Sequence, residues 1–305
     1  RGACIVPIQD PGRLATGGRG VTRRQWLEAG TLLLAAARPG SSAAEAAAEL
    51  RIGLVTDLHY ADKPAAGRRR YRQTPAKLAE AAENLTAERI EILVALGDLI
   101  DSADTVAGEQ QYLETIHREL AKIGREQHYV LGNHCVERLE KDEFLGVVGQ
   151  ERASYSFDRA GVHFLILDAC FREDGTAYGR RNFKWTDANI PAAQLEWLEA
   201  DLADGKGPAI VLVHQRLDET ESHSVRNAAR AREVLERSRR VVAVFQGHSH
   251  HNDLQEIGGI RYCTLAAMVE GEAPEFNAYA VLRIAADGSI SVQGFRRQRG
   301  YDWPA

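Results

Sequence analysis

Residues 91–98 read EILVALGD and residues 127–134 read QHYVLGNH. Each stretch contains an apolar run, ILVAL at 92–96 and YVL at 129–131, which indicates a buried strand and is followed by a glycine and polar side chains. The polar residues are Asp98 in the first stretch and Asn133-His134 in the second. Residues 108–122 between them carry a helical pattern, so the order strand, helix, strand predicts an α/β sheet.

The same alternation continues from Arg51 to the C-terminus. No long linker or internal repeat interrupts it, so residues 51–305 are predicted to form one domain. Thr74 precedes Pro75 and is the expected N-cap of a helix that runs to Glu88. Further helices are predicted at residues 191–202 and 225–239, and strands at residues 51–56, 154–157, 162–167, 209–213, 241–245, 278–284 and 289–295, with two short strands joined at residues 258–259.

Residues that commonly bind metals follow five of these strands directly. They are Asp57-Leu58-His59, Gly97-Asp98, Gly132-Asn133-His134, His214 and Gly247-His248-Ser249-His250. Because the carboxyl ends of strands in an open α/β sheet converge on one crevice, we expect these side chains to share one space. Carboxylates, an amide oxygen and imidazoles without a thiolate suit Mn, Fe or Zn and not a structural cysteine site. The set is too large for one ion, so it predicts two ions about 3.5–4 Å apart that clamp a phosphoryl group and activate a bridging hydroxide.

The remaining polar features are expected to be structural. The four cysteines are too scattered for a disulfide framework and are expected to be free buried thiols. A lone histidine is more often structural than catalytic, which is the interpretation favoured for His117, His128, His163 and His223.

Composition and charge exclude several classes of protein. The 305 residues are 44% hydrophobic and 27% charged, which is typical of a globular chain and excludes disorder. A net charge of −5 gives no bulk positive field for binding nucleic acid or acidic lipid. No apolar run approaches the length of about 20 residues that a membrane span needs.

Residues 1–50 differ from the rest of the chain and are predicted to be a leader. An Arg23-Arg24 pair precedes a short apolar run at residues 32–37 and an Ala-rich tract that ends near Ala48. This order is similar to a cleaved twin-arginine export signal, whose machinery carries folded proteins. The leader therefore predicts a periplasmic or secreted protein that acquires its metals before export.

The polar residues after the strands resemble those of the calcineurin-like metallophosphoesterases, and the resemblance covers residues 51–298. It implies an α/β (α+β) fold in which a two-sheet β-sandwich is flanked by helices, giving four layers. It also implies that Asp98 bridges two metals and that His134 lies beside them, stabilises the phosphate and protonates the leaving oxygen. The implied ligands are Asp57, His59 and His250 for one metal, and Asn133, His214 and His248 for the other.

Two residues depart from the family pattern. Cys135 stands where an acidic residue often follows the Asn-His pair, which leaves the partner of His134 undetermined. Asp101 stands where purple acid phosphatases have a tyrosine ligand, which argues against that branch.

A narrower resemblance concerns the substrate. Residues 56–63 (TDLHYADK), together with Arg70-Tyr71-Arg72, LDA at 167–169 and QLEWL at 194–198, are similar to the Mn-dependent ADP-ribose/CDP-alcohol diphosphatases. This implies that Lys63, Tyr71 and Arg72 contact a nucleoside diphosphate, the tyrosine by stacking on the base. Residues 68–70 are expected to form a solvated basic loop.

These expectations describe an exported hydrolase of phosphoric esters or anhydrides, with attack by metal-bound hydroxide and His134 as the acid. Two alternatives within the same mechanism are a broad phosphomonoesterase of alkaline-phosphatase type and a phosphodiesterase. A third is a binding scaffold without catalysis, which would be expected to lose ligands; none of the expected ligands is missing here.

Overall fold

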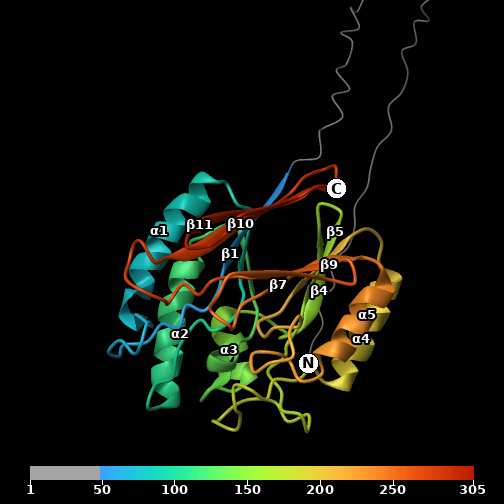
Figure 1. The fold of residues 1–305 in the computed structure, drawn as a ribbon. Coiled ribbons are helices and arrows are strands. Elements are labelled where there is room, and N and C mark those ends of the chain that lie inside the picture. Colours follow the sequence, from blue (N-terminus) through green and yellow to red (C-terminus); the bar gives the residue numbers. More distant parts are fainter. Residues whose placement is uncertain (1–48) are drawn as a thin grey trace, which may run out of the picture. The chain divides into compact units, whose positions relative to one another are not determined.

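The computed structural model describes residues 49–305, so residues 1–48 of the predicted leader lie outside the described part, and Leu50, its last residue, already belongs to the first strand. Two six-stranded mixed sheets form the centre of this part (Figure 1). The first has the order β12-β11-β10-β1-β2-β3, with β1, β2 and β3 parallel. Its strands are β1 (Leu50–Val55), β2 (Ile92–Ala95), β3 (Glu126–Tyr129), β10 (Ala278–Ile284), β11 (Ile290–Arg296) and β12 (Tyr301–Trp303).

The second sheet has the order β4-β5-β6-β7-β9-β8, and its four central strands are parallel. The antiparallel strands β4 and β8 lie at its two edges. Its strands are β4 (Tyr155–Arg159), β5 (Val162–Ile166), β6 (Ala209–Leu212), β7 (Val241–Gln246), β8 (Asp253–Ile257) and β9 (Ile260–Thr264).

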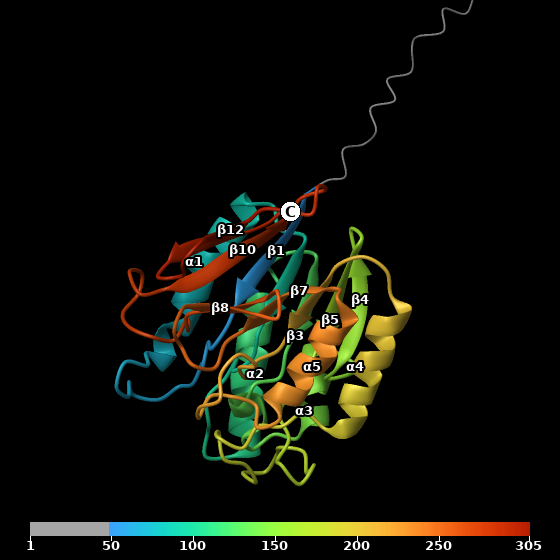
Figure 2. The ribbon, with the colours of Figure 1, turned by 45° about the vertical axis from the view of Figure 1, so that its right-hand side comes forward.

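Helices cover the outer face of each sheet (Figure 2). Three clusters of apolar side chains fill the spaces between the layers. Ile52 and Phe164 belong to the cluster between the sheets. Leu113 lies between the first sheet and its helices, and Leu198 lies between the second sheet and its helices. The helices are α1 (Thr74–Ala87), α2 (Val106–Leu120) and α3 (Lys141–Val148) on the first sheet, and α4 (Ala192–Asp204) and α5 (Ala228–Ser238) on the second. The expected four-layer sandwich is confirmed.

The structure adds or changes some local features. Helix α3 and strand β12 have no counterpart among the predicted elements, and α5 begins three residues later than expected. The prediction that Thr74 is the N-cap of α1 is wrong, because Gln73 is the residue at that position. Instead, the Thr74 hydroxyl donates to the Leu58 carbonyl at 2.7 Å and ties the start of α1 to the loop after β1.

The three cysteines within the described part, Cys135, Cys170 and Cys263, are free and buried, as expected. Among residues 49–305, no helix combines the length and apolar character that crossing a bilayer requires.

Candidate metal centre

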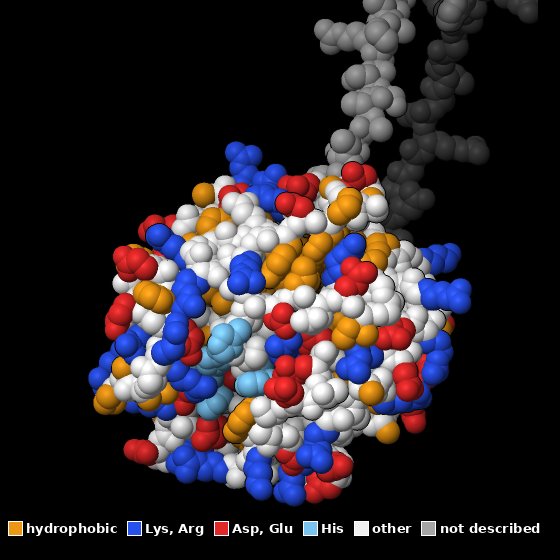
Figure 3. All heavy atoms as spheres, viewed as in Figure 1, with side chains coloured by type: hydrophobic (Ala, Val, Ile, Leu, Met, Phe, Trp, Pro, Cys, Tyr) orange, Lys and Arg blue, Asp and Glu red, His pale blue; other side chains and the backbone are white. Residues whose placement is uncertain are grey.

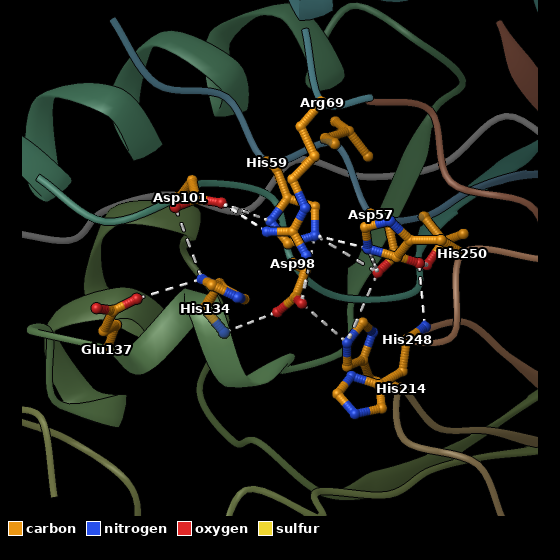
Figure 4. A network of polar contacts seen from close by, with 12 residues as sticks. Asp57, His59, Arg69, Asp98, Asp101, His134, Glu137, His214, His248 and His250 are labelled. Atoms are coloured by element: carbon orange, nitrogen blue, oxygen red, sulfur yellow. Dashed lines mark hydrogen bonds and ion pairs between the residues drawn. The ribbon is translucent and has the colours of Figure 1, made fainter. Parts of the chain in front are cut away.

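The predicted ligands converge at the carboxyl ends of the parallel strands of both sheets (Figure 4). Asp57 and His59 follow β1, Asp98 follows β2, and His214 follows β6. Asn133 begins the short helical turn η2 (Asn133–Val136) after β3, and His248 and His250 follow β7. Histidine side chains are visible at the surface beside Lys and Arg side chains (Figure 3), whereas His59 and His214 are fully buried.

Asp57 lies at the centre of the first ligand group. Its Oδ1 is 3.7 Å from His59 Nε2 and 3.4 Å from His250 Nε2, yet it has no hydrogen-bond partner among the described residues. Its other oxygen accepts from the Thr56 hydroxyl at 2.8 Å and from the His248 amide at 3.1 Å. One oxygen is therefore fixed by the protein, and the other is left for a cation.

Asp98 connects this group to a second one. Its Oδ1 accepts from the His134 amide at 2.8 Å. Its Oδ2 lies 3.1 Å from His214 Nε2 and 3.6 Å from His59 Nε2, so one carboxylate oxygen faces imidazoles of both groups. This position suits a ligand shared by two cations.

The second group leaves three buried polar atoms without a hydrogen-bond partner among the described residues. They are Asn133 Oδ1, His214 Nε2 and His248 Nε2. A buried polar group without a partner costs about 1–3 kcal/mol, and here each such atom is a common metal ligand. Asp57, His59 and His250 could hold one cation, and Asp98, His214 and His248 another. The donors present fit two divalent cations.

Three ligand imidazoles are fixed by partners on their other ring nitrogen. His59 Nδ1 lies 3.1 Å from Asp101, and His214 Nδ1 lies 2.7 Å from the Leu96 carbonyl. His250 Nδ1 lies 2.9 Å from Glu270. Such contacts set the tautomer that leaves Nε2 free for a metal.

Glu270 itself is held by a buried lysine. The Nζ of Lys77 donates to the carbonyls of Met268, Glu270 and Gly271 at 2.7, 2.9 and 2.8 Å. This lysine on α1 fixes the loop after β9 beside His250.

Five residues of the centre share a left-handed backbone conformation. Asp57, His59, Asp98, His248 and His250 all have φ between 43° and 69°, a region that non-glycine residues seldom occupy. Backbone hydrogen bonds stabilise these turns; for example, the His59 amide donates to the Asp98 carbonyl at 2.8 Å. Residues in sparsely populated regions cluster at functional sites, where the surrounding structure maintains them.

Close packing explains the glycines that precede the ligands. A Cβ on Gly132 would lie 2.2 Å from Asp98 Oδ1 and 2.4 Å from the Asp98 amide nitrogen. A Cβ on Gly247 would lie 2.2 Å from the Thr56 hydroxyl and 2.6 Å from Asp57 Oδ2. The Gly-Asn-His and Gly-His sequences are therefore required by the approach of one ligand loop to the next.

Burial and neighbouring charges shift the pKa values of the ligand histidines in opposite directions. Burial lowers the pKa of His214, but Asp98 and Asp57 outweigh burial and raise that pKa to about 9. Burial also lowers the pKa of His250, and Asp57 and Glu270 likewise raise it to about 9. Burial and the neighbouring His214 lower the pKa of His248 to about 3. Without cations, two of the ligand imidazoles therefore carry protons that metal binding must displace.

His134 lies beside the ligand groups, opposite His214 and His248 (Figure 4). Its Nδ1 is 3.2 Å from Glu137 Oε2. Burial lowers the pKa of His134, but Asp98, Glu137 and Asp101 outweigh burial and raise it. A partly exposed imidazole with a raised pKa beside a metal group can donate a proton.

A cavity of about 290 Å³ opens over these groups. Asp98 and His134 form part of its floor, and Arg69 and Trp185 form part of its wall. Trp185 is 45% exposed, and its ring centroid lies 6.2 Å from that of His248. The other lining residues are Asn133, His223, His248, Ser249, His250, His251 and Glu270.

The three residues expected to contact the substrate, Lys63, Tyr71 and Arg72, lie outside the cavity lining. Tyr71 is buried against Ala61, Ala267 and Val269, so its ring cannot stack on a base. Lys63 donates to Asp101 at 2.6 Å. Arg72 is exposed and pairs with Asp62 at 2.6 Å. None of the three lines the cavity.

Two residues expected to be structural lie at the cavity instead. Arg69, expected on a solvated loop, lines it and donates to Asp101 at 3.2 Å. His223 lines it as well, with its ring 5.3 Å from that of Trp185. By contrast His163 is held between Asp158 and Asp201, in agreement with its expected structural role.

Sequence reasoning missed three residues of this region: Glu137, Glu270 and Trp185. The spacing of Glu137 in the sequence could have indicated its role, because it follows His134 by about one helical turn. Trp185 and Glu270 lie in irregular loops, where no sequence pattern indicated that they would reach the site.

Comparisons with known proteins agree with this geometry. Residues 50–252 match the profile of the calcineurin-like phosphoesterase family. A zebrafish (Danio rerio) manganese-dependent ADP-ribose/CDP-alcohol diphosphatase is 23% identical, over 78% of this chain and 93% of the relative. A probable cyclic nucleotide phosphodiesterase of Synechococcus sp. is 24% identical, over 80% and 91% of the two chains.

Solved structures show the same fold. A dimetal phosphatase from Danio rerio has a TM-score of 0.74 at 20% identity, covering 83% of this chain and 98% of the other. A purple acid phosphatase from yellow lupin (Lupinus luteus) has a TM-score of 0.55 at 16% identity, covering 84% and 53%. Because the family profile spans more than half of the sequence and the fold agrees, the chain belongs to the calcineurin-like phosphoesterase family and is a metal-dependent phosphoesterase.

Proposed function

We propose that this protein hydrolyses phosphoric esters or anhydrides at a pair of divalent cations. The observation that supports this most directly is the set of buried ligand atoms without partners, arranged in two groups that meet at Asp98. When bound, two such cations would neutralise charge on a phosphoryl group and lower the pKa of water. Manganese, iron and zinc all suit the oxygen and imidazole donors.

The chain's own residues supply the remaining parts of the mechanism. Asp98 fixes the two ligand groups relative to each other. His134, whose pKa is raised, holds a proton beside the cavity and delivers it to the leaving oxygen. Glu270 and Asp101 orient the imidazoles of His250 and His59.

The cavity wall supports a nucleoside-diphosphate-linked substrate. Arg69 has guanidinium donors beyond the one that binds Asp101, and these can bind a second phosphate. Trp185 offers an exposed indole face on which a base can stack. A monoester would need neither residue. The name of the zebrafish relative points to the same substrate class.

The test compares the wild type with Trp185→Ala and with Arg72→Ala on ADP-ribose, CDP-choline, p-nitrophenyl phosphate and bis-p-nitrophenyl phosphate, each with Mn²⁺. Stacking contributes about 1–3 kcal/mol per base, so Trp185→Ala should lower kcat/KM for ADP-ribose roughly 5- to 150-fold. It should leave p-nitrophenyl phosphate nearly unaffected. Arg72→Ala is the matched control, because Arg72 is exposed and lies outside the cavity lining.

The competing substrate classes give different results in the same assay. Cleavage of p-nitrophenyl phosphate alone would identify a general phosphomonoesterase. Preference for bis-p-nitrophenyl phosphate would identify a phosphodiesterase, the class named for the Synechococcus relative. Metal binding without turnover of any of these would indicate a scaffold.

A further inference from the structure

His134 lacks the acidic neighbour that the family pattern led us to expect. Cys135 occupies that position, and its side chain is fully buried in the cluster between the first sheet and its helices. Burial raises the pKa of the Cys135 thiol to about 12, so it supplies no negative charge. An orienting partner for His134 must therefore come from elsewhere.

Asp101 is close to His134, but its oxygens are already in use. Its Oδ1 accepts from Lys63 at 2.6 Å and from the Ser102 amide at 2.8 Å. Its Oδ2 lies 3.1 Å from His59 Nδ1 and accepts from Arg69 at 3.2 Å. The distance from Oδ1 to His134 Nδ1 is 3.8 Å, too long for a hydrogen bond.

Glu137 is placed correctly by the local backbone. Asn133–Val136 forms the 3-10 turn η2, with Glu137 at its C-cap. Because such a turn has about three residues per turn, residues 134 and 137 lie on the same side. Glu137 Oε2 is 3.2 Å from His134 Nδ1, which is an ion-pair distance, although the geometry is not that of a hydrogen bond and Nδ1 has no hydrogen-bond partner among the described residues. The other Glu137 oxygen is 3.8 Å from exposed Arg181.

We propose that Glu137 is the positioning residue of His134 and replaces the acidic neighbour that Cys135 has displaced. The Glu137 carboxylate faces Nδ1 and favours a proton on that nitrogen, so that Nε2 is the nitrogen available to the leaving oxygen. This inference rests on the proposed function, in which His134 protonates the leaving group.

The test measures kcat and KM on phenyl and p-nitrophenyl phosphoesters with Glu137→Ala, Glu137→Gln and His134→Ala, with metal content determined for each. Outer partners of this kind contribute about 10- to 100-fold, so Glu137→Ala should lower kcat on the phenyl ester by that factor without raising KM. The p-nitrophenyl ester needs no proton and should lose less than about threefold. Glu137→Gln keeps an acceptor at the same place and should lose less than Glu137→Ala.

A double variant separates positioning from general damage. If Glu137 acts through His134, adding Glu137→Ala to His134→Ala should change kcat less than about twofold. Arg181→Ala is the control, since it removes the exposed partner of Glu137 and leaves the contact with His134. Equal losses on both esters, additive losses in the double variant, or loss of metal would overturn the proposal.

NMR of the imidazole nitrogens shows which nitrogen of His134 carries the proton, and this measurement does not depend on turnover. In the metal-free protein at alkaline pH, the neutral His134 ring should carry its proton on Nδ1, and Glu137→Ala should shift it toward Nε2. An Nε2–H tautomer in the wild type would overturn the positioning role. Wild-type protein that cleaves no phosphate would refute the proposed function and leave this measurement valid.

Discussion

Replacement of Asp98 by asparagine tests the shared metal centre directly. The two side chains have the same shape, so the acceptor of the His134 amide at 2.8 Å can be retained while one negative charge is removed. The lost charge faces imidazoles of both ligand groups, His214 at 3.1 Å and His59 at 3.6 Å. The substitution should therefore weaken both cation positions and not only one.

The magnitude follows from the position of Asp98. Partners that only orient a ligand contribute about 10- to 100-fold to metal affinity or activity. A carboxylate that faces both groups should exceed the upper end of that range, so kcat/KM should fall by at least about 10²-fold, or about 2.7 kcal/mol. Metal content should fall below that of the wild type at the same free Mn²⁺ concentration.

The assay combines metal analysis after dialysis against a fixed Mn²⁺ concentration with turnover of the best phosphate substrate. Asp168→Asn is a matched control, because Asp168 is also a buried aspartate that follows a strand of the sandwich, but it pairs with Lys141. The control should keep its metal. An Asp98→Asn variant with full metal content and near-normal turnover would refute the shared-ligand interpretation.

Two further predictions concern metal binding and export. Neighbouring carboxylates raise the pKa of His214 and of His250 to about 9 in the metal-free protein, so both imidazoles are protonated at neutral pH. Metal binding at neutral pH should therefore release about two protons. The affinity for metal should rise with pH until the pH passes about 9. Calorimetry in buffers of different ionisation enthalpy measures this, and binding without proton release would contradict it. We also propose that the leader is a twin-arginine signal, so Arg23→Lys combined with Arg24→Lys should leave the protein in the cytoplasm, whereas unchanged export in cell fractions would show another route.

The ligand set could be predicted from the sequence because its signals are local. Each ligand stands within a few residues of the end of a buried strand, and apolar runs such as ILVA at 92–95 are readily identified as strands. Parallel pairing then brings the ends of separate strands together without any further information from the side chains.

The residues that line the cavity outside the ligand groups could not be predicted in this way because they depend on loop paths. Tyr71 is near the metal ligands in sequence, but apolar neighbours from a loop almost two hundred residues later enclose its ring. Trp185 reaches the cavity from a long irregular segment that carries no periodic signal. Glu270 contacts His250 from the loop after β9, where buried Lys77 donates to the Glu270 carbonyl.

The strained and charged features of the centre have a common physical cause. Five ligand residues occupy left-handed backbone conformations, four ligand atoms lack hydrogen bonds within the described chain, and two imidazoles are protonated without metal. Each feature is unfavourable for folding alone, and each places a donor toward the same small space. Bound cations would satisfy the unpaired atoms and replace the protons in balancing Asp57 and Asp98. Backbone hydrogen bonds and close glycine contacts therefore hold these donors in an arrangement that bound cations would stabilise.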